Sequence, residues 1–202
     1  MKLRYLADKV IGDCHRCPLA RGRRSIVFGV GSARARIVFV GEAPGGEEDL
    51  RGEPFVGPAG ARLDAWLDAV GLARDDVYIA NVVKCRPPGN RDPRPSEVDA
   101  CAPFLRAQLR AIEPRVIVAL GRHAAMFMSG RDDMSLGRLR RMQLAYRDPK
   151  MQGRTIPVVA TYHPAFILRK PEGAERDRFE SGVLGDLRRA IEIAESSGRE
   201  HP

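Results

Sequence analysis

The sequence predicts an α/β fold in which helices cover both faces of a parallel sheet. Four runs of apolar, β-branched residues are bounded by turn residues, and helical patterns lie between them. The runs are continuously apolar, which is typical of strands buried on both faces, and strands that alternate with helices favour parallel pairing. The 202 residues suffice for one domain with a real core. We therefore expect a single domain over 1–202 with a four-stranded parallel sheet.

The expected strands are short and separated by helical segments. A short extended segment is expected before the first main strand, in "SIVFGVGSARARIVFV" (25–40), and the N-terminal segment over 1–35 carries the C-x-x-C motif. The four main strands are expected at 36–41 ("RIVFVG"), 77–83 ("VYIANVV"), 115–121 ("RVIVALG") and 156–164 ("IPVVATYHP").

The expected helices follow from apolar residues at helical spacing. The segment 59–72 places Leu63, Trp66, Leu67 and Val70 on one face, and Gly71 is a suitable C-cap. The segment 95–112 opens with Pro95 and Ser96, which suit a helix start. Further helices are expected from 122 and over 182–197, with frayed residues over about 196–202.

The chain is strongly basic. Its formal net charge is +8 and its pI is about 9.8. Such a balance favours a polyanionic partner such as nucleic acid. An alternative is a GC-rich genome, because only five of the 34 basic residues are Lys. The positive charge is nevertheless uneven and is dense over 137–154, which favours nucleic acid.

The N-terminus carries charges throughout, and no apolar stretch reaches the roughly 18 residues of a membrane span. We therefore expect a cytoplasmic protein that does not contact a membrane.

Polar and glycine-rich residues follow the ends of the expected strands. They are "GEAPGGEED" (41–49), Asn81, Gly121 and "YHP" (162–164). Ligands of open α/β sheets bind at the carboxyl ends of the strands. The sequence therefore predicts a binding site at this edge.

The four cysteines have the count of one four-thiolate site. Cys14 and Cys17 form a C-x-x-C motif, Cys85 follows the second strand, and Cys101 lies on the next expected helix. A disulfide is the weaker explanation in a cytosolic protein, and a buried free thiol is an alternative for Cys101. The spacing alone does not separate Zn²⁺ from an iron–sulfur cluster.

These motifs occur together and in order along the chain. They are C-x-x-C at 14–17, "GEAPGGEEDLRGEPFVGPAG" at 41–60, "NVVKCRPPGNRDP" at 81–93, Cys101, and "HPAFILR" at 163–169. The set resembles the family 4 uracil-DNA glycosylases, the iron–sulfur branch of that superfamily, over roughly residues 1–170. The resemblance implies a [4Fe–4S] cluster on the four cysteines. It also implies hydrolytic removal of uracil from single- or double-stranded DNA in base excision repair, by a monomer that leaves an abasic site.

The resemblance implies roles for three residues of a uracil pocket. Phe55 would stack on the base, Asn81 would pair with O4 and N3–H, and His163 would donate a hydrogen bond to O2 as charge develops there. From the sequence alone, Phe55 is more simply explained as a core residue and His163 as a structural one, and the resemblance reverses both interpretations. His123 matches no motif and is expected to be structural.

The glycine-rich loop is expected to form one wall of the pocket. Gly41, Gly45 and Gly46 would let its backbone approach the base, and Ala43 would be among the uracil-binding residues. Glu48 would border C5 and exclude the methyl group of thymine. Other branches of the superfamily carry a water-activating Asp or Asn where this chain has Ala43. The resemblance therefore leaves the water to Glu42, the second expected catalytic residue, or to the main chain.

The expected DNA contacts follow the last strand. Ile167 and Leu168 would form an apolar wedge beside the flipped base, or would simply be buried. Arg169 and the cluster Arg138, Arg140 and Arg141 would bind phosphates. Ala165 stands where the family often has Ser, which removes one expected phosphate contact.

Two other classes of protein compete with the enzyme. Ala43 and Ala165 leave room for a catalytically weak iron–sulfur DNA-binding protein associated with replication or repair. A dinucleotide-binding domain is disfavoured because the chain lacks G-x-G-x-x-G.

Overall fold

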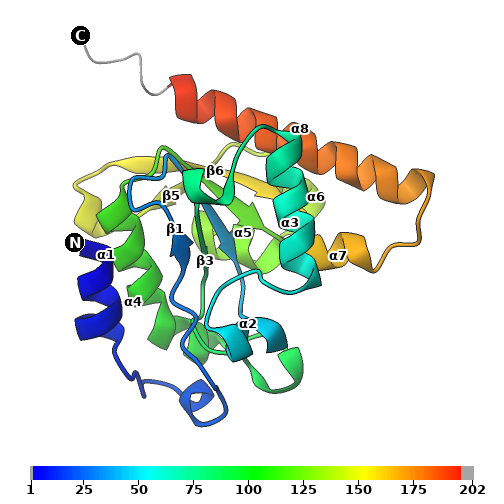
Figure 1. Cartoon of the computed structure of the whole chain (residues 1–202). Helices are drawn as coiled ribbons and strands as arrows, with labels where there is room; N and C mark the ends of the chain where they lie inside the picture. Colours follow the sequence, from blue (N-terminus) through cyan, green and yellow to red (C-terminus); the bar gives the residue numbers. More distant parts are fainter. Residues whose placement is uncertain (1, 197–202) are drawn as a thin grey trace.

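The computed structural model describes residues 2–196, and the expected frayed tail lies almost entirely outside them. Its centre is one six-stranded mixed sheet with the strand order β1-β3-β2-β4-β6-β5 (Figure 1). The α/β class is confirmed, but the expectation of four strands is wrong. An antiparallel strand is added at each edge of the four parallel ones.

The four parallel strands are those expected from the apolar runs. They are β2 (Ile37–Gly41), β3 (Tyr78–Asn81), β4 (Val116–Leu120) and β6 (Thr155–Thr161). The edge strands are β1 (Val30–Gly31) and β5 (Leu144–Arg147). Gly41 pairs in register with Asn81 at the carboxyl ends of β2 and β3. The parallel register therefore brings these two residues to one edge of the sheet.

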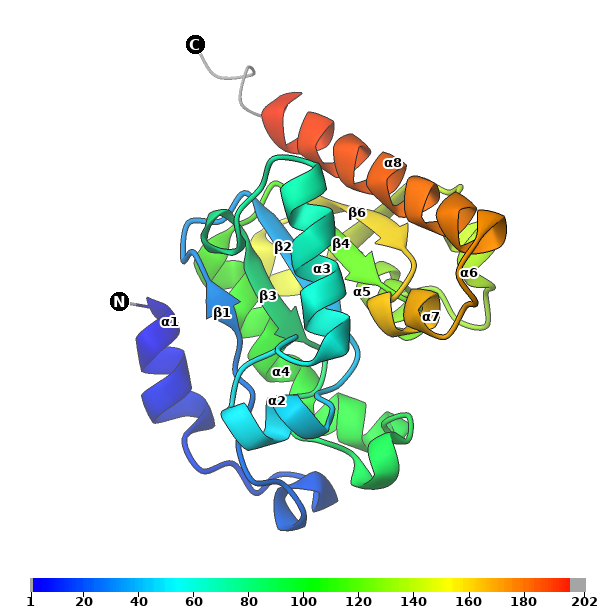
Figure 2. The same cartoon turned by 45° about the vertical axis from the view of Figure 1, so that its right-hand side comes forward.

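Helices cover both faces of the sheet (Figures 1 and 2). One layer holds α3 (Pro58–Ala69) and α8 (Ala174–Ser196), which pack on Phe39 and Val118. The other layer holds α4 (Pro95–Ile112) and α5 (Arg122–Ser129), which pack on the alternate residues of the same strands. Two apolar layers therefore hold the strand ends in place.

Short elements connect this frame. The α-helical ones are α1 (Lys2–Tyr5), α2 (Gly46–Arg51), α6 (Leu136–Leu139) and α7 (Pro164–Leu168). The others are the π-helical turn η1 (Leu6–Ile11) and the 3₁₀ turns η2 (Pro18–Arg21), η3 (Arg74–Asp76), η4 (Pro88–Asn90) and η5 (Pro149–Met151). Among the described helices, none is both long and apolar enough to cross a membrane.

Candidate active site

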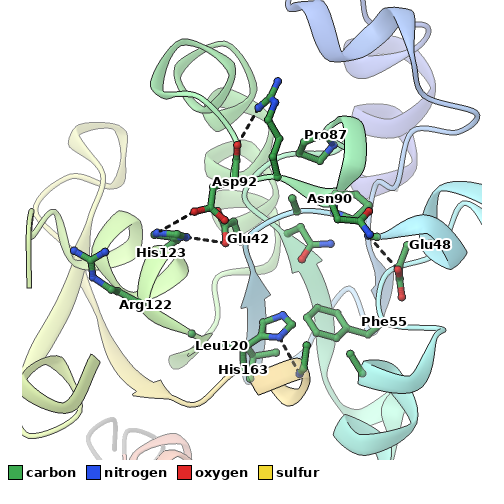
Figure 3. Close-up of a pocket in the computed structure, with 18 of the residues that line it drawn as sticks. Glu42, Glu48, Phe55, Pro87, Asn90, Asp92, Leu120, Arg122, His123 and His163 are labelled. Carbon is green, nitrogen blue, oxygen red and sulfur yellow. Dashed lines mark hydrogen bonds and ion pairs between the residues drawn. The ribbon is translucent and has the colours of Figure 1, made fainter. Parts of the chain in front are cut away.

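A pocket of about 500 Å³ opens at the carboxyl ends of the parallel strands. Residues that follow β2, β3, β4 and β6 converge on it, and the loop 87–92 forms part of its wall (Figure 3). Its lining includes the expected residues Glu42, Ala43, Glu48, Phe55, Asn81, His163, Ala165 and Arg169. The fold therefore brings these residues together from distant parts of the chain.

Asn81 is held at the end of β3 with an unused hydrogen-bonding atom. The residue is 1% exposed, and within the described chain its Oδ1 has no hydrogen-bond partner. Leaving a buried carbonyl oxygen unpaired costs about 1–3 kcal/mol, and buried polar atoms are normally satisfied. An unpaired amide oxygen in a pocket wall is therefore suited to a ligand.

Gly41 lies against Asn81 and Phe55. A Cβ at position 41 would come within 2.3 Å of Asn81 Oδ1 and 2.7 Å of Phe55 Cζ. Gly41 thus works by leaving space, since its backbone conformation needs no positive φ.

We predict that Gly41→Ala lowers the uracil excision that the sequence resemblance implies by about a hundredfold, because the methyl group displaces the amide and the ring together. Excision from an oligonucleotide measures this. The matched control is Gly22→Ala, since an added Cβ there meets nothing within 4 Å. Wild-type excision by Gly41→Ala would show that this wall is not used.

Phe55 is held in an unusual backbone conformation. Its φ is +53°, and its side chain both packs in the α3 core layer and lines the pocket. The carboxylate of Glu48 accepts hydrogen bonds from the backbone N–H groups of Val56 at 3.0 Å and Gly57 at 3.1 Å. It also accepts one from Gly45. Glu48 therefore fixes the loop that carries Phe55, and its expected contact with C5 of a base stays a prediction.

His163 is set up as a neutral hydrogen-bond donor. It caps α7, where its Nδ1 accepts the backbone N–H of Ala165 at 3.1 Å. Burial, and then the charge of Arg169, lower the pKa of His163 to about 4. The ring is therefore neutral at pH 7 and carries its proton on Nε2. Its centroid lies 5.7 Å from that of Phe55 (Figure 3).

Glu42 makes an ion-pair contact that the sequence did not reveal. Its carboxylate lies 2.8 Å from His123 Nδ1, and Asp92 lies 3.9 Å from the other ring nitrogen (Figure 3). Burial raises the pKa of Glu42, which the hydrogen bond from His123 opposes. His123 was expected to be structural, but it lines the pocket. Its place just after the carboxyl end of β4 was the available signal.

The segment after His163 divides between rim and core. Ala165 and Arg169 line the pocket, and Leu168 is 37% exposed. Ile167 is fully buried against α3 and α8, so the expectation that it forms part of a DNA wedge is wrong.

The three arginines of the cluster after α5 differ in exposure and in their contacts. Arg138 and Arg141 are exposed. Arg140 instead bonds to Asp186 at 2.8 Å and to the carbonyl of Gly182, with its guanidinium stacked over Tyr162. This side chain is committed within the fold, so the expectation that Arg140 binds phosphate is wrong.

The four cysteines come together from three segments of the chain. Cys14, Cys17, Cys85 and Cys101 are all free and line one small cavity. Cys101 Sγ accepts the backbone N–H of Lys84 at 3.2 Å, and Arg23 donates to Cys85 Sγ at 3.8 Å. Burial raises the pKa of Cys85 and Cys101, and these donors oppose that shift and favour the thiolate form that metal sites require.

The spacing of these sulfurs bears on which metal group they suit. One tetrahedral zinc ion, with Zn–S bonds of about 2.3 Å, would hold its sulfurs roughly 3.8 Å apart. Within residues 2–196, the group of three His, Cys, Asp or Glu ligand atoms that lie within 4.8 Å of one another is Glu42, Asp92 and His123, so no three of the cysteine sulfurs lie that close together. This spacing is wider than one zinc ion would hold, and a larger polynuclear group can accommodate it.

Together the fold and the pocket define an α/β protein whose pocket places an aromatic ring, an amide and a neutral imidazole where they suit a planar, uncharged heterocycle. Comparison with known proteins narrows this class. The chain belongs to the uracil DNA glycosylase superfamily, whose family model matches residues 28–188.

Individual relatives narrow it further. A type-4 uracil-DNA glycosylase of Archaeoglobus fulgidus is 46% identical over 177 residues, which cover 88% of this chain and 89% of the relative. Another of Thermotoga maritima is 40% identical and covers 98% and 97%. A type-5 uracil-DNA glycosylase of Pyrobaculum aerophilum matches only 54% of this chain, at 36% identity. The likeness is therefore more extensive on the type-4 side.

Proposed function

We propose that this chain is a monofunctional uracil-DNA glycosylase, which hydrolyses the N-glycosidic bond of a flipped-out deoxyuridine and leaves an abasic site for base excision repair. The observation that carries the proposal is the unpaired Asn81 Oδ1 beside the Phe55 ring and the neutral His163. Family membership and the names of the relatives support it. The alternative, an inactive DNA-binding module, is disfavoured because an inactive pocket has no use for an unsatisfied buried amide.

Asn81 supplies the recognition of the base. An amide presents one acceptor and one donor group side by side, which match N3–H and O4 of uracil. Cytosine presents the opposite pattern, and a mispaired buried polar group costs about 1–3 kcal/mol. Phe55 provides the aromatic face on which the ring stacks, and Gly41 and Ala43 complete the wall.

His163 supplies the electrostatic term of catalysis. As the bond to C1′ breaks, negative charge develops on uracil O2, where His163 Nε2–H donates a hydrogen bond. The donor is already oriented by the bond between Nδ1 and the backbone, so no reorganisation is needed as charge appears.

Glu42 supplies the carboxylate that would orient the attacking water. Ala43 carries no functional group that could bind water, whereas Glu42 lines the pocket with its side chain 28% exposed. Its negative charge would orient the attacking water and stabilise the cationic sugar. His123 holds this carboxylate at 2.8 Å and thereby fixes its direction.

We predict that Glu42→Gln lowers the single-turnover rate of uracil excision by about 10²-fold or more, because it keeps the size and removes the charge. His123→Asn should lower the rate by roughly tenfold, since it releases Glu42 without removing it.

The matched control is Glu47→Gln, an exposed carboxylate of the same loop that pairs with Arg51. A rate within twofold of wild type for Glu42→Gln would assign the water to the main chain instead.

The rim of the pocket fits the DNA backbone. Arg169 lies at the mouth, and Arg138 and Arg141 are exposed cations in the charge-dense segment. Leu168 is the remaining candidate for a wedge, and Ala165 offers its backbone near the pocket. We propose single- or double-stranded DNA as the substrate, bound by one protomer that forms a single domain over 1–202.

The cysteines would hold one [4Fe–4S] cluster through Cys14, Cys17, Cys85 and Cys101. Such a cluster ties the N-terminal segment to the loop after β3 and to α4, and this crosslink is what it contributes to the fold. No step of the hydrolysis passes through it.

The proposal is tested by incubating the protein with an oligonucleotide that carries one uracil and cleaving abasic sites with alkali. Strand cleavage at uracil, and none at thymine or cytosine in the same position, is the expected result. Absence of cleavage from both single- and double-stranded substrates would refute the activity.

A further inference from the structure

Lys84 is a lysine with no exposed surface, placed between the pocket and the cysteines. Its relative exposure is 0%. The side chain folds back, and Nζ donates to the backbone carbonyl of Asn81 at 2.8 Å. The backbone N–H of the same residue donates to Cys101 Sγ at 3.2 Å. One residue thus bonds both to a cysteine of the quartet and to the residue proposed to read the base.

The buried ammonium needs a negative partner. Lysine is almost never fully buried unless it is paired. Burial lowers the pKa of Lys84 to about 7, and the charge of Cys101 opposes that shift. Among the described residues, no carboxylate forms an ion pair with the Lys84 ammonium, which instead donates to the Asn81 carbonyl. Lys84 also lines the cysteine cavity. Four cysteines that hold a [4Fe–4S] cluster carry net negative charge, so the loaded site supplies the missing counter-charge.

Other backbone hydrogen bonds restrict the movement of the segment 81–84. The carbonyl of Lys84 accepts the backbone N–H of Val27 at 2.8 Å, and Val83 N–H donates to the carbonyl of Glu42 at 3.0 Å. β3 ends at Asn81, so the Lys84 ammonium binds the carbonyl of its last residue. Movement at the cysteines would therefore reach the pocket wall over three residues of chain.

We propose that Lys84 is a positioning residue that couples the loaded cysteine site to base recognition. The negative charge of the cysteine site holds the ammonium, the ammonium holds the Asn81 carbonyl, and the Asn81 side chain is thereby aimed at the base. This inference rests on the proposed function for the identity of the base. It adds that the cluster does more than tie segments together.

The coupling is reciprocal if it exists, since a linkage between two sites acts in both directions. Occupying the pocket must then shift the midpoint potential of the cluster, and removing the Lys84 charge must do the same. Loss of a nearby positive charge destabilises the more negative, reduced cluster. The potential is a readout that a purely structural lysine would not alter in this way.

The experiment compares wild type, Lys84→Met and Gln108→Met. Gln108 is equally buried, but its amide bonds to the carbonyl of Phe28 and to Tyr78, away from the site. Iron per chain and the visible absorbance band first establish that the cluster is held. Then the midpoint potential is measured, together with the Kd for an oligonucleotide carrying 2′-fluoro-deoxyuridine, a slowly cleaved substrate analogue.

Lys84→Met is expected to keep iron, to shift the potential to more negative values, and to weaken binding roughly tenfold, as for one lost hydrogen bond. Gln108→Met is expected to lower the melting temperature and change neither quantity. Wild-type potential and Kd in an iron-loaded Lys84→Met protein would overturn the proposal.

If Lys84→Met does not retain iron, the coupling is tested on the wild-type protein alone. Saturating free uracil should shift the potential of its cluster, and an unchanged potential in protein shown by calorimetry to bind uracil would overturn the coupling.

If wild type neither binds nor excises uracil, the proposed function fails. The coupling is then decided by hydrogen exchange of the segment 79–84 with and without iron, where equal protection in both forms would overturn it.

Discussion

The His163→Ala variant is expected to excise uracil about 10²- to 10³-fold more slowly than wild type, the usual loss when one preorganised donor to a developing oxyanion is removed. The loss should fall on the single-turnover rate rather than on DNA affinity, because the donor acts where charge develops. Quenched-flow excision with excess enzyme measures the rate, and fluorescence anisotropy measures the affinity.

The His163→Asn variant separates catalysis from helix capping. Asparagine is among the best N-cap residues, so its side-chain oxygen can accept the Ala165 N–H that His163 Nδ1 now accepts. His163→Asn should therefore melt near the wild-type temperature and still be slow. If instead its rate recovers along with its stability, capping of α7 is the whole role of His163.

The pH dependence follows from the low pKa of this ring. The pKa of His163 is lowered to about 4, so the residue stays neutral from pH 5 upward. Its donor is therefore present throughout that range, and excision should show no loss from protonation of His163 between pH 5 and 8. Because the unfolded chain binds this proton near the ordinary His pKa of about 6.5 and the folded chain only near 4, the free energy of unfolding should fall as pH drops from about 6.5 toward 4 and be independent of His163 above that range.

The sequence predicted those elements whose signals are local. The helix 95–112 matches α4 at both ends because Pro95 suits the first turn and apolar residues recur at helical spacing. The two edge strands have weak signals: β1 lies where only a short extended segment was expected, and β5 was not expected at all. β1 has only two residues, and β5 carries the alternating burial of a half-exposed strand within an arginine-rich stretch. Helix α8 begins at Ala174, earlier than expected from 182, because its first turns are mostly polar.

Some residues of the candidate site could also be predicted from local signals in the sequence, and others could not. Glu42, Asn81 and His163 could be predicted because the carboxyl ends of parallel strands meet at one edge of a sheet. His123 also follows the carboxyl end of a parallel strand, β4, but that position alone does not tell which way a histidine on a helix points until α5 is packed. The burial of Ile167 and of Lys84 likewise depends on the layers around them, which the sequence does not specify locally. Arg140 is a further example, because the partner that holds its side chain, Asp186, lies 46 residues away.

The Asn81→Ala variant is expected to lose uracil excision by roughly 10²- to 10⁴-fold, from two hydrogen bonds worth about 1–3 kcal/mol each in a buried site. Its stability should not fall in proportion. Asn81 Oδ1 is unpaired in the described structure, so truncation removes a polar atom that folding leaves unsatisfied. The space left behind opens into the pocket, where water can fill it. We therefore expect a melting temperature equal to or above that of wild type.

This opposition between stability and activity is the signature of a residue retained for function. Gln108→Met supplies the contrast. The Oε1 of Gln108 is also unpaired in the described structure, but its Nε2 donates to the Phe28 carbonyl and the Tyr78 hydroxyl inside the fold, so its loss should lower stability and leave excision unchanged. Calorimetry and excision of uracil and cytosine are measured on the same preparations. The ratio of uracil to cytosine excision should also narrow in Asn81→Ala, since the amide is the group that distinguishes them. A variant that melts several degrees lower and keeps its preference for uracil would show that Asn81 supports the strand end and does not read the base.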